Sequence, residues 1–464
     1  MKTLTIHPSD NVAVCLEAQG NIPAGHKLAL TDIAAGEQVI KYGHAIGRAK
    51  EDIRAGEWVH THNLRSGLDE DAAYSYNFRA ETPPAETHTF LGFPRKGRRA
   101  GVRNDIFIIP SVGCVNGVCR RLAASAQKYI SGTIDGIWAL EHPFGCSQLG
   151  QDQVNLIELL TSLARNPNAS FVLFVGLGCE NTRLDFLREA LRDCDHVAYL
   201  CCQDETDEHA AGLAILKVFA ERAANLKREA VSLAELCIGL KCGGSDGFSG
   251  ITANPTVGRV SDRVVASGGS AVLTEVPEMF GAEQVLMDKC VSEDVFRRYC
   301  EMIGSFKQSY RDQGFPIYEN PSPGNREGGI TTLEEKSLGC VEKAGHTAVV
   351  DVLGYGARVQ KPGVSVLNGP GNDLIAATAL AAAGCQLVLF TTGRGTPFAT
   401  CVPTLKISTN AALAAKKTGW IDFDASGSDD AGLFKLVLRC ADGAYRCKSE
   451  DSREIAFYKT GVTL

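Results

Sequence analysis

The chain has 464 residues, 44% of them hydrophobic, and a formal net charge of −7, which is typical of a globular protein with roughly three domains. Its pI of about 5.9 and the lack of a basic stripe argue against a nucleic-acid or anionic-membrane partner. No apolar run approaches the roughly 18 residues of a membrane-spanning helix, so no membrane partner is expected.

The first residues lack the apolar stretch and cleavage site of a secretory signal, so a cytoplasmic location is expected. In that compartment the 17 cysteines should be mostly reduced thiols rather than a disulfide framework.

A five-residue motif that ends in glycine occurs three times near the N-terminus, at residues 21–25, 32–36 and 52–56. Each copy is followed by a short apolar stretch, which is typical of small strands between turns. The sequence therefore predicts a compact all-β domain over residues 1–70. Residues 66–86 are polar and include a proline pair, and a basic run follows at residues 95–99, so residues 71–100 are predicted to be a linker.

From residue 104 onward, continuous apolar runs alternate with helical stretches, as at residues 106–109, 171–175 and 386–390. Apolar runs without alternation fit strands that are buried on both faces of a parallel sheet. A change in pattern near residue 235 suggests a boundary. We therefore expect an α/β middle domain over residues 101–235 and a second α/β domain over residues 236–464.

Four of these apolar runs end in a glycine-rich turn that contains a cysteine: Cys114, Cys146, Cys179 and Cys242. Ligands bind outside the carboxyl ends of strands in open parallel sheets, and a following helix lowers the pKa of a thiol. We therefore predict that these thiolates, with Asp246, hold a metal. Buried cysteine can equally serve as a small apolar packing residue.

Two histidines, His60 and His62, close the N-terminal domain, and on a strand they would share one face. Such a pair can provide general acid and base catalysis, whereas a solvated strand face is the alternative. Glu275 and Glu278 lie three residues apart, and Glu275 is a further candidate for catalysis or metal binding, although a capped helix start would look similar.

Substrate-binding candidates come from loops that offer guanidinium groups, amides or closely approachable backbone. The loop that begins at Cys242 is rich in glycine and hydroxyl groups, which suits an anion. An arginine near a strand end can bind a carboxylate in a bidentate manner, although solvated loop arginines are common. The candidates are Arg103, Asn104, Gly243, Gly244, Ser245, Asn254 and Arg394.

Long blocks of this sequence resemble the altronate/galactarate dehydratase family over nearly the whole length. The blocks are residues 25–33, 60–63, 101–104, 112–116, 145–150, 176–181, 242–255, 274–284, 328–340, 393–397 and 461–464. The resemblance implies an N-terminal β-clip (SAF-type) domain, an α/β middle domain and a Rossmann-like parallel-sheet C-terminal domain. It also implies a homodimer that needs Fe²⁺ or Mn²⁺, with an iron–sulfur cluster as the alternative cofactor.

The resemblance further implies a hydro-lyase that dehydrates D-altronate, a small sugar acid, to 2-dehydro-3-deoxy-D-gluconate. Another sugar acid such as galactarate is the alternative substrate, and an inactive sugar-acid-binding protein is the alternative class. A dehydrogenase is disfavoured because the turn after residue 175 lacks the third glycine of a dinucleotide fingerprint.

Overall fold

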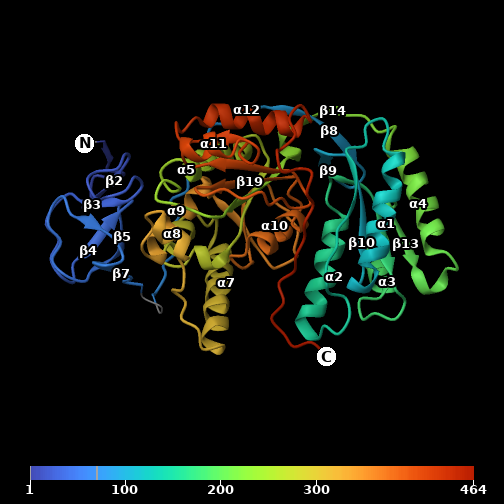
Figure 1. Cartoon of the computed structure of the whole chain (residues 1–464), viewed down its shortest axis with the longest axis horizontal. Helices are drawn as coiled ribbons and strands as arrows, with labels where there is room; N and C mark the ends of the chain where they lie inside the picture. The colour runs from blue at the N-terminus through green and yellow to red at the C-terminus, as the bar shows by residue number, and fades with distance from the viewer. Residues whose placement is uncertain (1, 69–71) are drawn as a thin grey trace.

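The computed structural model describes residues 2–68 and 72–464. Three bodies lie in a row, with the N-terminal β domain at one end and the middle domain at the other (Figure 1). The C-terminal domain lies between them, so the chain crosses the molecule after the first domain and later returns to the centre. Within the described residues, none of the helices has the length and hydropathy needed to cross a membrane.

The N-terminal domain consists of two small sheets, in the strand orders β1-β2-β3-β6 and β4-β5-β7. The second and third repeats stabilise each other's turns. Asp32 accepts a hydrogen bond from Ala55 N and Asp52 accepts one from Ala35 N, both at 2.8 Å. The strands are β1 (Thr3–Leu4), β2 (Val12–Cys15), β3 (Lys27–Ala29), β4 (Gln38–Lys41), β5 (His44–Ala49), β6 (Trp58–Val59) and β7 (Leu64–Arg65).

The predicted linker is only partly a linker. Residues 72–88 have no regular structure and run along the C-terminal domain. The following residues form β8 (Thr89–Arg95) and β9 (Arg98–Gly101), which make a three-stranded antiparallel sheet with β14 (Glu229–Ser232). The linker prediction is therefore wrong for the residues of β8 and β9, because Phe90, Phe93 and Ala100 are buried core residues.

The middle domain is a four-stranded parallel sheet in the order β11-β10-β12-β13. Alternate residues of its strands enter two separate cores, one of which continues across α2 to α10 of the C-terminal domain. The elements are β10 (Asp105–Pro110), α1 (Asn116–Ala126), β11 (Gly136–Ala139), α2 (Gly150–Ala164), β12 (Ala169–Gly176), α3 (Leu184–Ala190), β13 (Val197–Cys201) and α4 (Glu208–Ala223).

The C-terminal domain is a seven-stranded parallel sheet in the order β17-β18-β16-β15-β19-β20-β21, which confirms the predicted fold class. The strand order reverses between β15 and β19. The strands are β15 (Cys237–Cys242), β16 (Ser270–Leu273), β17 (Val349–Leu353), β18 (Gly363–Leu367), β19 (Leu387–Thr392), β20 (Thr404–Ser408) and β21 (Phe423–Asp424).

Helices cover both faces of this sheet, with α5 and α12 above it and α10 below it in Figure 1. The helices are α5 (Ala253–Ala266), α6 (Glu283–Met287), α7 (Glu293–Asp312), α8 (Pro323–Glu327), α9 (Leu333–Val341), α10 (Asp373–Ala382), α11 (Ala411–Lys416) and α12 (Asp430–Ala441). The chain end returns to the middle domain beside α2, where Asp152 accepts hydrogen bonds from the backbone of Thr460 and Gly461 at 3.0 and 2.7 Å.

Candidate active site

The strand order reverses between β15 and β19 and so forms a switch point. In sheets of this kind ligands bind in the crevice outside the carboxyl ends of the strands at that point. The turn after β15 is tied to β19, because Gly243 N donates to the Thr391 carbonyl at 3.0 Å. Gly244 has φ +62, and the N–H groups of Gly244 and Ser245 have no acceptor among the described residues. Successive free N–H groups of this kind form a concave anion site.

Two glycines keep this turn open. A Cβ on Gly243 would lie 2.7 Å from the Asp373 carboxylate, and one on Gly393 would overlap the Asp246 carboxyl group. The prediction that this loop approaches a ligand with its backbone is therefore compatible with the geometry.

Arg394 lies beside the turn after β15, with its side chain 49% exposed. One guanidinium nitrogen, Nη1, contacts the Glu327 carboxylate and the Gly324 carbonyl, both at 3.2 Å. The remaining guanidinium donors have no partner within the described part of the chain. Arg394 can therefore offer donors to a carboxylate bound at the free N–H groups.

A buried ion network lies beneath this crevice. Lys241 donates to the Glu275 carboxylate, to Asp373 at 2.7 Å and to the Cys242 carbonyl at 2.6 Å. Burial alone would lower the pKa of Lys241, but the charges of Glu275 and Asp373 outweigh it and hold that pKa above its usual value. Lys241 thereby holds Cys242, the last residue of β15, in position.

Glu275 has left-handed backbone geometry, with φ 75, and is 1% exposed. That conformation is rare for a residue other than glycine and is often found at functional sites. Burial first, and the neighbouring Glu278 charge second, raise the pKa of Glu275. Glu275 is buried and paired with Lys241, so it holds Lys241 in position and is not open to a ligand.

Two cysteines and a carboxylate meet next to this network. The Glu278 carboxylate lies 3.1 Å from Cys242 Sγ and 3.2 Å from Cys340 Sγ, and the two sulfur atoms are 3.4 Å apart. The Cys340 thiol holds the pKa of Cys242 down at about 6, against burial. Lys343 Nζ lies 2.9 Å from Cys242 Sγ, and Lys336 Nζ lies 2.8 Å from Glu278.

This set is the one group of three or more ligating side chains within 4.8 Å that residues 2–68 and 72–464 contain. Its spacing approaches the roughly 3.5 Å that separates ligands around a tetrahedral ion with bonds of about 2.0–2.3 Å. The three side chains offer two sulfur donors and one carboxylate oxygen. The donor set therefore fits a divalent ion such as Fe²⁺.

The four predicted metal-binding cysteines do not form one site. Cys242 follows β15 of the C-terminal sheet, whereas Cys114, Cys146 and Cys179 follow β10, β11 and β12 of the middle sheet and are exposed. The loops that carry those three cysteines touch, since Gly113 N donates to the Phe144 carbonyl and Thr182 N to the Gly145 carbonyl. The prediction of a shared site is wrong because the chain changes sheet between β13 and β15.

Asp246 does not join the metal-ligand set. Its carboxylate accepts hydrogen bonds from Phe248 N, Ser249 Oγ, Thr409 Oγ1 and Asn410 Nδ2 at 2.9–3.2 Å. Both oxygens are therefore occupied in organising the loop that follows β15, and the prediction of Asp246 as a ligand is not supported by this geometry.

The N-terminal domain brings three histidines toward the same region. His60 and His62 lie in a turn after β6 rather than on one strand face, so the predicted strand geometry is wrong. His60 stacks on Trp58 with ring centroids 5.2 Å apart and lies 5.0 Å from the His26 ring. His26 Nε2 contacts the Glu327 carbonyl at 3.2 Å, which links the cluster to the partner of Arg394.

Burial, reinforced by the nearby positive charge of Lys27, lowers the pKa of His60 to about 4. The unfolded chain takes up this proton near pH 6.5, so stability from neutral His60 is present above that pH and is lost between about pH 6.5 and 4. We expect urea denaturation to show a smaller loss of unfolding free energy between pH 7 and 5 in His60→Gln. An equal loss in both proteins would contradict this prediction.

A buried salt bridge holds the N-terminal domain in place. Lys27 and Lys41 each contact the Glu335 carboxylate at 2.8 Å, and all three side chains are at most 2% exposed. Burial opposes ionisation of Glu335, but the two lysines hold its pKa below the usual range. The packing is also close in the backbone, where a Cβ on Gly247 would overlap the Gly25 carbonyl.

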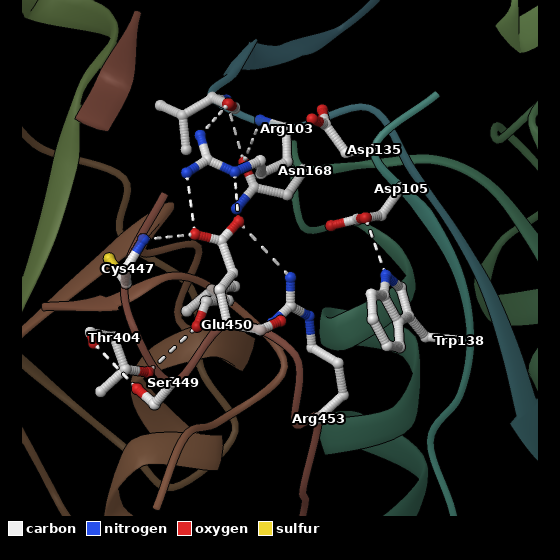
Figure 2. A network of polar contacts seen from close by, with 12 residues as sticks. Arg103, Asp105, Asp135, Trp138, Asn168, Thr404, Cys447, Ser449, Glu450 and Arg453 are labelled. Atoms are coloured by element: carbon white, nitrogen blue, oxygen red, sulfur yellow. Dashed lines mark hydrogen bonds and ion pairs between the residues drawn. The ribbon is translucent and has the colours of Figure 1, made fainter. Parts of the chain in front are cut away.

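Arg103 and Asn104 lie outside the crevice. Arg103 is fully buried and binds both Glu450 oxygens, at 2.5 and 3.0 Å, in a network that joins the middle and C-terminal domains (Figure 2). Asn104 Nδ2 donates to the Thr133 hydroxyl at 3.1 Å and to the Ala223 carbonyl at 2.9 Å. Both substrate-binding predictions are wrong, because each polar group is already paired inside the protein.

Asn254 is likewise structural, since it is fully buried and bridges the Gly339 carbonyl and the Thr391 hydroxyl at 2.8 and 2.6 Å. Sequence reasoning did not single out His26, Cys340, Lys336 or Lys343 as site residues. Cys340 ends one of the blocks that carry the family resemblance, so that block offered a signal for it. The lysines offered none, because their partners are 58 to 101 positions away along the chain.

Comparisons with known proteins cover nearly the whole chain. Residues 16–67 match the "Altronate/galactarate dehydratase SAF domain", residues 92–224 match "D-galactarate dehydratase/Altronate hydrolase, second domain", and residues 233–463 match "D-galactarate/Altronate dehydratase, C-terminal". The matched ranges agree with the three bodies of the structure.

Curated relatives extend this match. An altronate dehydratase of Bacillus subtilis is 47% identical over 99% of both chains, and one of Escherichia coli is 48% identical over 100% of both. A galactarate dehydratase of Escherichia coli is 31% identical over 96% of this chain and 94% of its own. The chain therefore belongs to the altronate/galactarate dehydratase family.

Proposed function

We propose that this chain is a hydro-lyase that converts D-altronate to 2-dehydro-3-deoxy-D-gluconate. The observation that carries the proposal is the pair of free N–H groups of Gly244 and Ser245 beside Arg394, which forms a carboxylate site at the switch point. The two relatives of highest identity reported above, both altronate dehydratases, favour altronate over galactarate as the substrate.

The reaction must remove a proton from carbon 2 and a hydroxyl from carbon 3, after which the enol becomes a keto acid. The proton beside a carboxylate is a poor acid, because its removal adds negative charge to an anion. The free N–H groups and Arg394 hold the carboxylate and stabilise that charge. Gly243 lets the backbone approach the substrate closely, since a side chain there would meet Asp373.

The histidines carry the proton transfers in this proposal. His60 is neutral at pH 7 because its pKa is about 4, so it can accept the carbon 2 proton. His62 is exposed next to Trp58 and can donate a proton to the departing hydroxyl. Glu275 and Lys241 act as positioning residues, because they are enclosed beneath the turn rather than open to substrate.

We further propose that iron is the cofactor and that Cys242, Glu278 and Cys340 hold it. The chemistry that a divalent ion supplies is neutralisation of charge on the substrate oxygens. The spacing and the donor types of these residues support this assignment. Mn²⁺ is the alternative ion, and an iron–sulfur cluster on Cys114, Cys146 and Cys179 is the alternative site.

Metal content separates the two sites. We expect Cys242→Ser to lose most of its bound iron after anaerobic reconstitution, whereas Cys194→Ser, a partly exposed control, keeps it. Iron and acid-labile sulfide are measured directly, without reference to activity. Loss of both in Cys146→Ser, with iron retained in Cys242→Ser, would overturn the assignment to Cys242 and place a cluster in the middle domain.

The function is tested by an anaerobic assay with Fe²⁺ and a thiol reductant, in which D-altronate and galactarate are offered separately and 2-keto-3-deoxy acid is followed. We expect turnover of D-altronate at a far higher kcat/KM than galactarate, and a raised KM in Arg394→Ala. Preference for galactarate would move the assignment within the family. Binding of D-altronate without turnover by folded, iron-loaded protein would favour the binding-protein alternative.

The cellular setting is also a proposal. We place the protein in the cytoplasm because its cysteine content suits a reducing compartment, and its acidic charge disfavours nucleic-acid and membrane partners. A homodimer is proposed from the family resemblance alone.

A further inference from the structure

A second polar pocket lies far from the crevice, at the opposite edge of both parallel sheets. Its volume is about 660 Å³, within the range of small-molecule sites. The turn at Gly97 between β8 and β9 lines it, together with residues just before β12, β15 and β19. These are the amino ends of the strands, whereas the crevice lies at the carboxyl ends. The pocket therefore spans the middle and C-terminal domains without touching the proposed active site.

Four arginines line this pocket, Arg98, Arg99, Arg165 and Arg358, against one acidic residue, Glu235. Arg165 is paired with Asp193 at 2.6 Å. The other three have no carboxylate partner in the described ranges. Three unpaired guanidinium groups and one carboxylate leave a net charge of about +2 in the pocket.

The hydrogen bonds of these arginines are incomplete. Arg98 donates to the carbonyls of Asn166 and Ala169 through Nη1, but its buried Nε has no acceptor. Arg99 contacts two carbonyls at 3.3 Å and the Ser270 hydroxyl at 2.9 Å. The Arg358 guanidinium has no hydrogen-bond or ion-pair partner among residues 2–68 and 72–464. Buried donors without acceptors cost free energy unless a ligand or ion supplies one.

Because Arg98, Arg165 and Arg358 line one pocket, their positive charges act on one another. Burial, reinforced by the positive charge of Arg165, lowers the pKa of Arg358 to about 10. Burial likewise lowers the pKa of Arg98 to about 10, and the charge of Arg358 acts in the same direction. An anion bound among them would relieve this repulsion.

We propose that this pocket binds a small dianion through a phosphate group, either inorganic phosphate or the phosphate of a monoester. Planar guanidinium groups match phosphate oxygens in a bidentate manner. A dianion also matches the unpaired charge of the pocket. No aromatic residue lines the pocket to stack a base, which disfavours a nucleotide. Because its walls come from two domains, the bound anion would link them.

Inorganic phosphate is the first probe, titrated calorimetrically into the full-length protein in chloride buffer of matched ionic strength. We expect saturable binding at one site, weakened at least about tenfold in Arg358→Gln, where charge-assisted hydrogen bonds are lost. Glu235→Gln should bind more tightly, because it removes the competing charge but keeps an acceptor for Ala100 N. Arg192→Gln, an exposed arginine on a surface ion pair, is the matched control and should bind as the wild type does.

Arg358→Gln should weaken phosphate binding and Glu235→Gln should strengthen it. A general folding defect would weaken binding in both variants, so the opposite signs identify a specific site. Glycerol 3-phosphate, with glycerol as its control, distinguishes a monoester from free phosphate by whichever binds more tightly. Binding should persist in saturating D-altronate, and turnover in phosphate-free buffer should be unchanged in Arg358→Gln. Absence of phosphate binding, or equal affinity in wild type, Arg358→Gln and Arg192→Gln, would overturn the proposal.

Discussion

Replacing Glu335 with Gln is expected to lower the free energy of unfolding by about 3–5 kcal/mol, because removing one partner of a buried ion pair leaves its counter-charges uncompensated. The change strands the ammonium groups of Lys27 and Lys41, which are at most 2% exposed. Urea denaturation measures the loss. Limited proteolysis within residues 72–88 should quicken as the N-terminal domain is released.

A surface ion pair provides the control for this prediction. Lys2 Nζ lies 2.7 Å from the Glu17 carboxylate, but both side chains are more than 60% exposed, so Glu17→Gln should change stability by less than about 1 kcal/mol. Replacing all three buried charges with apolar residues should restore much of the lost stability. A loss below about 1 kcal/mol in Glu335→Gln would mean that this salt bridge does not hold the domain.

Replacing His60 with Gln is expected to reduce kcat for D-altronate by about 10²–10⁴-fold, the usual contribution of a general base. Glutamine keeps a side chain that can pack on Trp58 but cannot accept the carbon 2 proton. The KM should change little, because the carboxylate is held by Gly244, Ser245 and Arg394 rather than by the histidine. Steady-state kinetics on iron-loaded protein measure both constants.

The loss of kcat can be assigned to the missing base only if His60→Gln keeps the iron content and the folding of the wild type. His44→Gln is a suitable control, since His44 lies in the same domain on β5, away from the Trp58 cluster. Wild-type turnover in His60→Gln with a large loss in His62→Gln would transfer the base role to His62. Full activity in both variants would remove the N-terminal domain from the proton transfers.

Local sequence patterns predicted the fold well because each acts over a few residues. The repeats at residues 32–36 and 52–56 stabilise each other's turns, and the apolar runs form the buried strands of two parallel sheets. The strand at residues 89–95 was missed although Phe90 and Phe93 are apolar, because it is short and lies between a polar segment and a basic run. Its pairing with β14 depends on a segment about 140 positions away.

The candidate site was predictable only where the signal was local. The glycine turns after β15 and β19 were found because their composition is itself unusual. The buried ion pairs were not predictable, because the sequence does not distinguish a buried lysine from a surface lysine. Lys27 and its partner Glu335, for example, are 308 positions apart. The prediction that Arg103 binds substrate was wrong for the same reason, because its partner Glu450 lies 347 positions later.

The most direct test of the account is the reaction of D-altronate in D₂O with iron-loaded protein under anaerobic conditions, followed by NMR. Loss of water between carbons 2 and 3, followed by ketonisation of the enol, predicts 2-dehydro-3-deoxy-D-gluconate with one solvent deuterium at carbon 3. D-altronate that remains unchanged with folded, iron-loaded protein would contradict the proposed function, while leaving the three-domain fold unaffected.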